Sequence, residues 1–352
     1  MDPWRAWFAA VILAGCAHAE FALKPWNGMD EWGAPSETKC YWLDVNWRDS
    51  KYRQCVRQYF DIMSTLMKRE GGVWRDCVPL VHMWHRTHVF GSDLFVDAGA
   101  NIGACTMLLT GVYNNISVVA FEPNPRNLFY FTRSLVANPS INRRVALYPY
   151  GLGDRLATFP IFMEKGNAGN SVLGTPVLTE KTPTATVEAV PLDAAFILDG
   201  RRVRVMKIDT QGFEVMVLRG SHYLLSSRRV GCFKFEVAPI FLTAMNTTAA
   251  ELFRSFERYG YVLLALSLPQ GLHPQGASRF RAVRQQERAE LERRGGDYCA
   301  CTAELASHLL RHESKNDQSR VGTAEHRRFS MPTLRARPDT RRSAAHSNAS
   351  NA

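Results

Sequence analysis

Between residues 91 and 268, short apolar runs typical of buried strands alternate with longer stretches in which apolar residues recur at helical spacing. The strands expected from the short runs are 94–96, 117–121, 145–150, 203–208, 232–237 and 261–266. The helices expected between them are 104–109, 124–137, 213–225 and 247–259. This alternation predicts a parallel sheet covered by helices on both faces, with ligands at the carboxyl ends of its strands.

The hydrophobic pattern is weaker outside this region and within one insertion. Residues 20–90 form an extension rich in Trp, Tyr and Arg, in which the apolar spacing predicts a helix over 52–68. Residues 155–190 interrupt the alternation with a glycine- and asparagine-rich turn between Thr/Val-rich stretches, which predicts a hairpin. We expect residues 269–313 to be helical or irregular, and the polar residues 314–352 to be a disordered tail.

The N-terminus has the order of features found in a secretory signal peptide. Arg5 precedes the apolar run 7–14, and Ala17-His18-Ala19 then matches a small-residue cleavage signal. Residues 1–19 are therefore predicted to direct the chain into the lumen of the secretory pathway or out of the cell. A peptide that targets another organelle is the alternative. No stretch approaches the ~20 apolar residues of a stable membrane span.

The formal net charge of +10 is concentrated at one end of the chain. The tail of residues 314–352 holds eight Lys or Arg against three Asp or Glu, which is half of that charge. A basic tail is usually a solvated extension. The chain also lacks the Asn/Asp-Pro-Pro-aromatic run that holds a flipped base, so we expect no nucleic-acid partner.

Eight cysteines offer both disulfides and buried thiols. Cys105 and Cys232 fall in a predicted core helix and a predicted core strand, where a free buried thiol is expected. Cys299 and Cys301 are spaced too closely for a zinc site and lack a matching Cys/His pair, so no metal is expected. Three cysteines that precede the core are candidates for disulfide bonds in an oxidising compartment: Cys40, Cys55 and Cys77.

The strongest candidate site is the run Phe-Val-Asp-Ala-Gly-Ala-Asn-Ile-Gly at residues 95–103. An apolar strand ends in the carboxylate Asp97 and turns through Gly99 and Gly103 into a helix. Glycines in such a turn let the backbone pass close to a ligand, and the helix N-terminus offers free N–H groups to an anionic group. The spacing departs from G-x-G-x-x-G at the middle glycine, which argues against a dinucleotide fingerprint.

A second carboxylate stands at the end of the next predicted strand. Glu122 follows Phe121 and precedes Pro123-Asn124-Pro125. The ends of neighbouring parallel strands meet at one edge of the sheet, where a carboxylate can accept both hydroxyls of a ribose. A structural role at the start of the following helix is the alternative for an isolated acid, and the pairing with the glycine turn favours the ribose.

Three ordered motifs make residues 91–268 resemble the FkbM-type methyltransferases. They are residues 95–103, residues 121–125, and Lys207-Ile208-Asp209 followed by Gly212, Glu214, Leu218 and Gly220. The resemblance implies an S-adenosylmethionine-dependent enzyme with the Rossmann-like class I fold, an α/β three-layer sandwich around a mostly parallel seven-stranded sheet. It also implies O-methylation of a hydroxyl on a sugar, a glycan or another small molecule.

The resemblance assigns the cofactor to the two strand ends. Glu122 would hold the ribose of S-adenosylmethionine. Asp154 follows the third strand, where enzymes of this fold approach the adenine, and a turn aspartate is its ordinary alternative. Four residues would line the turn that holds the methionine part: Asp97, Gly99, Asn101 and Gly103.

The third motif lies where the acceptor should enter, at the carboxyl end of the strand 203–208. Asp209 is the predicted general base. Glu214 is a second catalytic candidate, or equally an acid in the first turn of a helix. Family members commonly have Lys-Ile-Asp-x-Glu-Gly here, and this chain has Gln211 in place of the glutamate. An amide cannot act as a base, so Glu214 and Glu236 are the other nearby acids.

Two other functions are compatible with these residues. An NAD-dependent oxidoreductase shares the glycine turn and the ribose acid, although the chain lacks the middle glycine and a suitably placed Tyr-x-x-x-Lys pair. A catalytically silent methyltransferase-like binding domain would explain Gln211. We expect residues 20–90 and 155–190 to select the acceptor, and the sequence indicates no oligomeric state.

Overall fold

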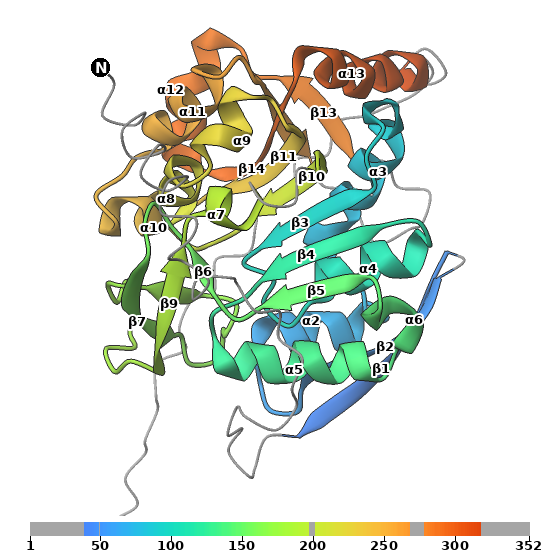
Figure 1. Ribbon diagram of the computed structural model, residues 1–352, viewed down its shortest axis with the longest axis vertical. Helices are drawn as coiled ribbons and strands as arrows, with labels where there is room; N and C mark the ends of the chain where they lie inside the picture. Colours follow the sequence, from blue (N-terminus) through green and yellow to red (C-terminus); the bar gives the residue numbers. More distant parts are fainter. Residues whose placement is uncertain (1–38, 49, 197–200, 268–277, 318–352) are drawn as a thin grey trace, which may run out of the picture.

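The computed structural model describes residues 39–48, 50–196, 201–267 and 278–317. The predicted signal peptide of residues 1–19 lies outside the described residues, as does the predicted tail after residue 317. Within the described ranges, a large sheet is flanked by helices, and two smaller sheets lie beside it (Figure 1).

The alternation seen in the sequence forms an eight-stranded sheet. In spatial order its strands are β13 (Arg279–Ala282), β12 (Val262–Ser267), β14 (Gly296–Cys301), β11 (Val230–Val237), β10 (Val203–Ile208), β3 (Leu94–Ala98), β4 (Ser117–Phe121) and β5 (Val145–Tyr148). The five strands from β5 to β11 run parallel, and β14 lies antiparallel between β11 and β12. The mostly parallel α/β fold is confirmed. The sheet has one strand more than the seven expected, because β13 pairs with the edge of β12.

Successive side chains of the central strands point to opposite faces of the sheet and enter separate hydrophobic cores. Phe95 of β3 packs with the helices of one face: α3 (Val78–Arg86), α4 (Ala104–Val112), α5 (Pro125–Val136) and α13 (Ala303–Asp317). Val96, the next residue, packs with those of the other face: α8 (Glu214–Arg219), α9 (His222–Ser226), α10 (Pro239–Ala244) and α11 (Ala249–Glu257). The strands are therefore covered on both sides, as expected for a parallel sheet.

The N-terminal extension contains a β-hairpin where a helix over 52–68 was predicted. β1 (Cys40–Trp47) and β2 (Ser50–Arg57) pair antiparallel, and the helix α2 covers only Ile62–Arg69. In the first half of β2, buried and exposed side chains alternate with the period of two that a strand imposes. The helix prediction was wrong for the part of 52–68 that belongs to β2. A few apolar residues at irregular spacing there fit the period of a strand as well as that of a helix.

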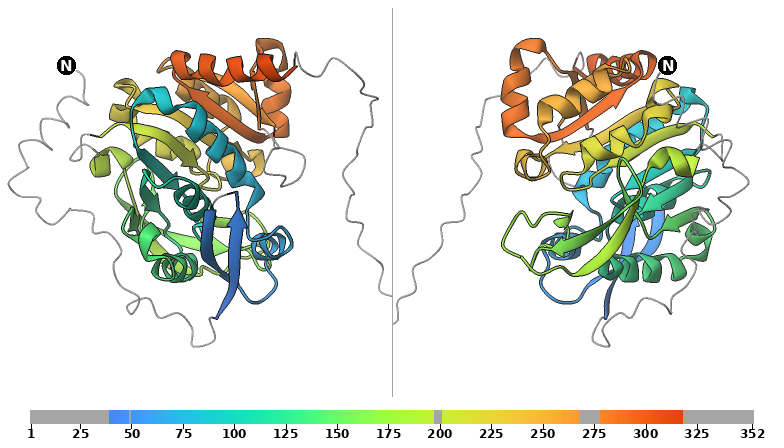
Figure 2. Two further views of the ribbon diagram at one scale, coloured as in Figure 1. Left: turned by 90° about the vertical axis from the view of Figure 1, so that its right-hand side faces the viewer. Right: turned by 60° about the vertical axis from the view of Figure 1, so that its left-hand side comes forward.

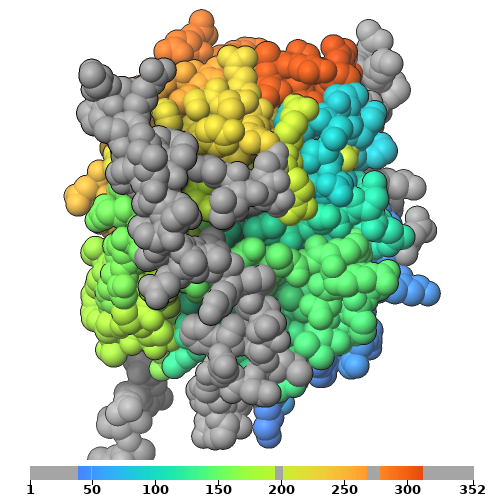
Figure 3. Space-filling model, viewed as in Figure 1, coloured from blue at the N-terminus to red at the C-terminus, as the bar shows by residue number. Residues whose placement is uncertain are grey.

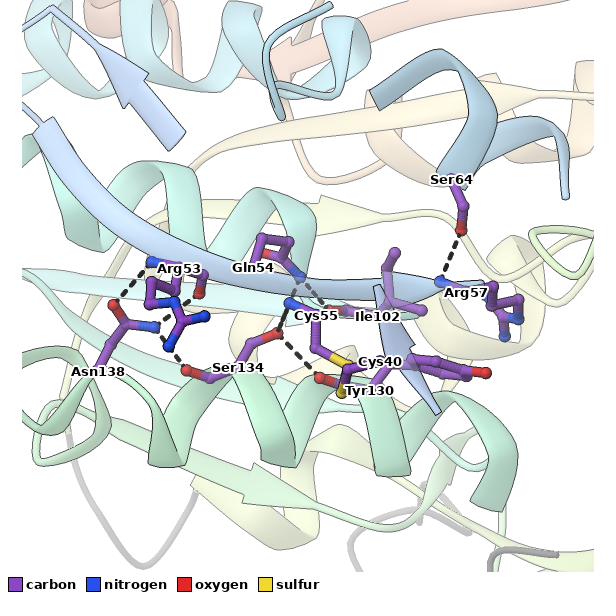
Figure 4. Close-up of a disulfide and its surroundings, with 10 residues drawn as sticks. All are labelled: Cys40, Arg53, Gln54, Cys55, Arg57, Ser64, Ile102, Tyr130, Ser134 and Asn138. Carbon is purple, nitrogen blue, oxygen red and sulfur yellow. Dashed lines mark hydrogen bonds between the residues drawn. A yellow bond between two sulfur atoms is a disulfide. The ribbon is translucent and has the colours of Figure 1, made fainter. Parts of the chain in front are cut away.

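The hairpin is fixed to the core beside the glycine-rich turn (Figure 4). The Gln54 side-chain amide donates to the Ile102 carbonyl oxygen at 2.9 Å and to Ser134 Oγ at 3.1 Å. The backbone N–H of Cys55 donates to the same Ser134 oxygen at 2.9 Å, and Cys55 is disulfide-bonded to Cys40. Because Ile102 belongs to the turn after β3, the extension braces the candidate site directly.

Three disulfides link six of the seven described cysteines, so the expectation of free thiols at Cys105 and Cys232 was wrong. Cys232 faces Cys301 in the antiparallel register of β11 and β14. Cys105 on α4 meets the short helix η2 (Arg75–Cys77), which packs against it. Cys299 is a buried free thiol. The pairs are Cys40–Cys55, Cys77–Cys105 and Cys232–Cys301.

The insertion at 155–190 belongs to a separate four-stranded sheet. In spatial order its strands are β6 (Gly151–Leu152), β9 (Ala185–Val190), β7 (Ala157–Met163) and β8 (Ser171–Leu173). β7 and β8 form the predicted hairpin around the turn 164–170. Figures 1 and 2 show this sheet at the arrowhead ends of β3, β4 and β5, which are their carboxyl ends. Its surface adjoins that of the core on the face seen in Figure 3.

After β13, the helix α12 (Arg288–Arg294) lies in the segment expected to be helical or irregular. Helix α13 continues to residue 317, a few residues into the segment predicted to be a disordered tail. Within the described ranges, no helix combines the length and the apolar character needed to cross a membrane.

Candidate active site

The turn after β3 is tied to the end of β4. The backbone N–H groups of Gly99 and Ala100 both donate to the Phe121 carbonyl oxygen, at 3.0 and 2.9 Å. Gly99, Asn101 and Gly103 all have positive φ angles, a conformation that most L-residues avoid. The turn therefore curls back over the strand ends before α4 begins.

The two glycines of this turn are required by the protein's own packing. A Cβ at Gly99 would lie 1.9 Å from the Asp209 carbonyl oxygen, and a Cβ at Gly103 would lie 2.1 Å from the Phe131 ring. Packing within the protein is thus a reason for both glycines in addition to the predicted close approach of a ligand. Gly99 still lines the cavity described below, whereas Gly103 is buried against α5 away from it.

Glu122 lies at the end of β4 and is only 3% exposed. One carboxylate oxygen accepts from the Asn101 N–H at 2.6 Å, and the other accepts from the Asn124 N–H at 2.9 Å and the Asn127 side-chain amide at 3.1 Å. Burial raises the pKa of Glu122 above its ordinary value, against the effect of these donors. A carboxylate has about four acceptor positions, so one is left for a ligand hydroxyl.

A cavity of about 510 Å³, called here the first cavity, opens at the carboxyl ends of β3, β4 and β10. It contains Glu122 and Gly99, as the sequence predicted, together with Tyr150–Leu152 and residues of the small sheet that the sequence did not single out. Its lining is Gly99, Asn101, Phe121, Glu122, Pro123, Asn127, Tyr150, Gly151, Leu152, Ile161, Gly169, Ser171, Leu173, Asp209, Thr210 and Gln211.

Asp154, predicted to contact the cofactor, is not part of this lining. Its carboxylate lies 3.1 Å from the guanidinium of its neighbour Arg155, at the surface. The adjacent backbone and side chains of Tyr150–Leu152 reach the cavity instead. The strand β6 carries the chain past the cavity two residues before Asp154, which sequence spacing could not show.

A second cavity of about 690 Å³ adjoins the first. The two share Asn101, Gly169, Asp209 and Gln211, which form the wall between them. The N-terminal extension contributes Trp74 to the second cavity, together with Ile62, Met63 and Asp76. The remaining lining is Ala100, Ala104, Cys105, Asn167, Asn170, Lys207 and Glu236.

Asp97 lies behind this wall as part of a buried ion network. Lys207 Nζ is 3.3 Å from Asp97, 3.3 Å from Asp209 and 2.8 Å from the Gly99 carbonyl oxygen. Burial opposes the charge on Lys207, but the two carboxylates outweigh it and raise its pKa. Asp97 also accepts from Thr106 Oγ1 at 2.8 Å and lines neither cavity, so its role is to hold the turn and Lys207 in place.

Glu214, predicted as catalytic, is held by hydrogen bonds within the protein. It is 3% exposed and accepts from the backbone N–H groups of Thr210 at 2.9 Å and Gly212 at 3.0 Å. These donors lie in the turn just before α8, and a carboxylate at the first position of the helix also complements its dipole. Because Glu214 fixes the turn 209–212, it positions Asp209 and Gln211 without reaching either cavity.

The wall residue Gln211 connects two carboxylates. Its side-chain amide donates to Asp209 Oδ1 at 2.8 Å and to Glu236 Oε2 at 3.2 Å. Burial favours the neutral form of Asp209, but Lys207, Lys234 and this hydrogen bond together hold its pKa below the ordinary value. Burial, then Asp209 and Asp297, raise the pKa of Glu236 to about 8.

Among the described residues, no group of three or more His, Cys, Asp or Glu side chains is arranged to hold a metal ion. The site therefore offers buried carboxylates, amides and one lysine as its chemical groups. Two neighbouring cavities that meet at ionisable side chains are suited to a transfer between two bound molecules.

Comparison with known proteins identifies the domain around these cavities. Residues 97–263 match the family described as the methyltransferase FkbM domain. "Methyltransferase 1" of Beauveria bassiana is 29% identical over 150 residues, covering 37% of this chain and 59% of its own length. "Methyltransferase sdnD" of Sordaria araneosa is 26% identical over 167 residues, covering 40% of this chain and 64% of its own length. The chain thus spans about three fifths of the length of these two relatives.

The solved structures that resemble this chain do so weakly. The crystal structure of methyltransferase FkbM from Methylobacillus flagellatus has a TM-score of 0.35 and 17% identity, covering 53% of this chain and 42% of its own. The family match agrees with the motifs at 95–103, 121–125 and 207–220 and favours a methyltransferase over an oxidoreductase. Residues 97–263 of this chain therefore resemble a methyltransferase domain of the FkbM family.

Proposed function

We propose that this protein is an S-adenosylmethionine-dependent O-methyltransferase that acts on a hydroxyl of a sugar, a glycan or another polyhydroxylated small molecule. The observation that carries the proposal is the pair of cavities that meet at Asp209 and Gln211. S-adenosylmethionine supplies a methyl group on a positively charged sulfur. The first cavity would hold it and the second would hold the acceptor.

The first cavity fits an adenosyl ligand in the chemistry of its lining. Glu122 keeps one acceptor position for a ribose hydroxyl, and Phe121 with Leu152 offers apolar surface to an aromatic base. Asp209 stays ionised and lines both cavities, so it favours a positively charged ligand group at the shared wall.

The second cavity fits a polyhydroxylated acceptor. Half-buried Trp74 presents an aromatic surface, while Asn167 and Asn170 present amides and Asp76 a carboxylate. Sugars combine apolar C–H faces with hydroxyl edges, which such a mixture of side chains can bind. Orienting an acceptor oxygen against the methyl group is the main catalytic task, and a fixed shared wall supplies that orientation.

The cellular compartment is a further part of the proposal. The signal-like residues 1–19 and the three disulfides of the described part both favour folding in the secretory lumen, where disulfides persist. N-terminal sequencing of the protein from its native source tests this directly. A new terminus after Ala19 supports it, and an intact cytosolic Met1 overturns it.

A catalytically silent binding domain is the second candidate, favoured by Gln211 in place of the family's glutamate. The experiment that separates the two begins with calorimetry of the full chain with S-adenosylmethionine and, separately, NAD. The protein is then incubated with methyl-labelled S-adenosylmethionine and a pool of glycosides, free glycans and small polyols, and mass spectrometry follows the label. Labelled acceptor supports the enzyme; tight cofactor binding without any transfer supports the silent domain, and binding of NAD alone overturns both.

A further inference from the structure

Glu236 is placed to take part in chemistry that the sequence assigned to Asp209. It is the penultimate residue of β11, it is half-buried, and it lines the second cavity but not the first. Asp209 lines both cavities. An acceptor bound in the second cavity would therefore face both carboxylates, whereas a cofactor in the first cavity would face only Asp209.

The two carboxylates have different partners. Asp209 is paired with Lys207 at 3.3 Å and accepts from Gln211 at 2.8 Å. Glu236 accepts from Gln211 at the longer distance of 3.2 Å. The lysine two positions earlier on its strand, Lys234, is 2.5 Å from Asp297 and so is already engaged.

Like charges surround Glu236 on several elements. Asp297 is its direct partner on β14, Asp209 follows β10, and Glu214 begins α8. Lys234 on its own strand opposes them. Lys207 on β10 and Asp76 on η2 complete the charged groups of the same cavity. Burial and these carboxylates raise the pKa of Glu236 to about 8, and burial raises that of Asp76 to about 6.

We propose that Glu236, and not Asp209, is the base that takes the proton from the acceptor hydroxyl. This inference rests on the proposed function. As the acceptor oxygen forms its bond to the methyl carbon, the carbon–sulfur bond breaks and its electron pair stays on sulfur, which becomes neutral. The hydroxyl proton passes to the Glu236 carboxylate, which later loses it to solvent. Two carboxylates in different surroundings thereby divide two roles.

Gln211 acts as a positioning residue in this arrangement. Its amide donates to both carboxylates and fixes the distance between them without adding charge. A glutamate at this position, as in other family members, would place a third carboxylate beside Asp209 and Glu236. The amide therefore permits Glu236 to carry the negative charge that a base needs.

The first test compares Glu236→Gln with the wild-type full chain on the acceptor that the labelling experiment identifies. We expect kcat to fall by roughly 10²–10⁴-fold in E236Q, while the Kd for S-adenosylmethionine changes by less than about threefold. The kcat/KM of the wild type should rise with pH through about 8, and E236Q should lack this rise. Glu188→Gln, an exposed acid on β9, is the matched control and should leave every value unchanged.

A second measurement does not depend on turnover. Protein labelled with ¹³C at the glutamate carboxyl carbons is titrated by NMR, and the resonance missing from E236Q identifies Glu236. It should titrate near pH 8 in the wild type, and at higher pH in Gln211→Glu because of the added negative charge. An ordinary glutamate titration, or an E236Q variant that keeps at least a third of wild-type kcat, overturns the inference. If the wild type itself transfers no methyl group, the proposed function fails and this inference fails with it.

Discussion

The first and second cavities share a wall, yet they are built in different ways. The first is formed largely by the ends of β3, β4 and β10 and by the small sheet, within one continuous domain. The second needs the N-terminal extension, which supplies Trp74 and Asp76 and is joined to α4 by the Cys77–Cys105 disulfide. The difference suggests that the domain supplies a site for one constant ligand, while a separate segment completes a more specific one.

The buried glutamates of the two cavities show the same contrast. Burial raises the pKa of both Glu122 and Glu236. Glu122 accepts three hydrogen bonds from neutral donors, which makes it a fixed acceptor for a ligand. Glu236 has one donor and three neighbouring carboxylates, which makes it a good proton acceptor. The same residue type is therefore proposed to bind the cofactor in one cavity and to react in the other.

The largest effect is expected where one change disrupts both cavities. Gly99→Ala places a Cβ 1.9 Å from the Asp209 carbonyl oxygen and must displace the shared wall. We expect a loss of about 3 kcal/mol or more in the free energy of unfolding, with no measurable binding of S-adenosylmethionine. Gly91→Ala, also at positive φ but in open space, is the control and should cost about 1 kcal/mol. Equal losses in the two variants would contradict this account.

Removing the disulfide beside the second cavity should weaken binding of the acceptor but leave binding of the cofactor nearly unchanged. The Cys77→Ser/Cys105→Ser variant opens a loop of 28 residues, which should cost about 3–4 kcal/mol of unfolding free energy. We expect acceptor KM to rise at least about tenfold while cofactor affinity changes little, because only the second cavity contains Cys105. The Cys40→Ser/Cys55→Ser variant should lose a similar stability without the change in acceptor KM. Equal acceptor KM values in the two double variants would contradict a specific effect of the Cys77–Cys105 disulfide on the second cavity.

Glu122→Gln should affect the first cavity alone. Its side-chain NH₂ would replace one carboxylate oxygen and present hydrogens to the N–H of either Asn101 or Asn124, which donate to opposite oxygens of Glu122. Losing hydrogen bonds to a charged acceptor is worth about 1.5–3 kcal/mol, so cofactor affinity should fall by about 10²-fold in calorimetry. E236Q serves as the contrasting variant, with near wild-type affinity. Wild-type cofactor affinity in E122Q would contradict the proposal that Glu122 binds the ribose of the cofactor.

The smallest effect concerns the pH dependence of stability. Because the pKa of Glu236 is raised in the folded protein, folding favours its neutral form. The stabilisation is complete below the unfolded-state pKa of about 4.3 and is lost as pH rises through about 8. E236Q should therefore unfold at a temperature higher than the wild type by about 3 °C or more at pH 9, and the gap should close at pH 4. A gap of the same size at both pH values would contradict the raised pKa.

The sequence predicted the core of the fold well because its strands are buried on both faces. Continuous apolar runs such as 94–96 and 203–208 allow few other structures when they alternate with amphipathic helices. The hairpin at 40–57 was missed because one face of it is polar and its apolar residues lack a clear period. The edge strand β13 has only one buried residue, so it left no hydrophobic signal.

For the candidate site, the sequence placed the strand ends but not the direction of each side chain. Gly99, Asn101, Glu122 and Asp209 do reach a cavity. The other four predicted residues face the protein interior or its surface: Asp97, Gly103, Asp154 and Glu214. Their residue types suit a ligand site and a structural role equally well, so composition could not separate the two.

The sequence by itself determined that two carboxylates and a glycine turn stand at the ends of adjacent parallel strands, because hydrophobic periodicity and connection length act locally along the chain. Only the tertiary structure decided that Glu236, Trp74 and Asp76 meet across a second cavity. Those residues come from β11 and the N-terminal extension, and their proximity depends on strand order and on the Cys77–Cys105 disulfide. The charge of a buried carboxylate likewise depends on which neighbours the fold brings to it.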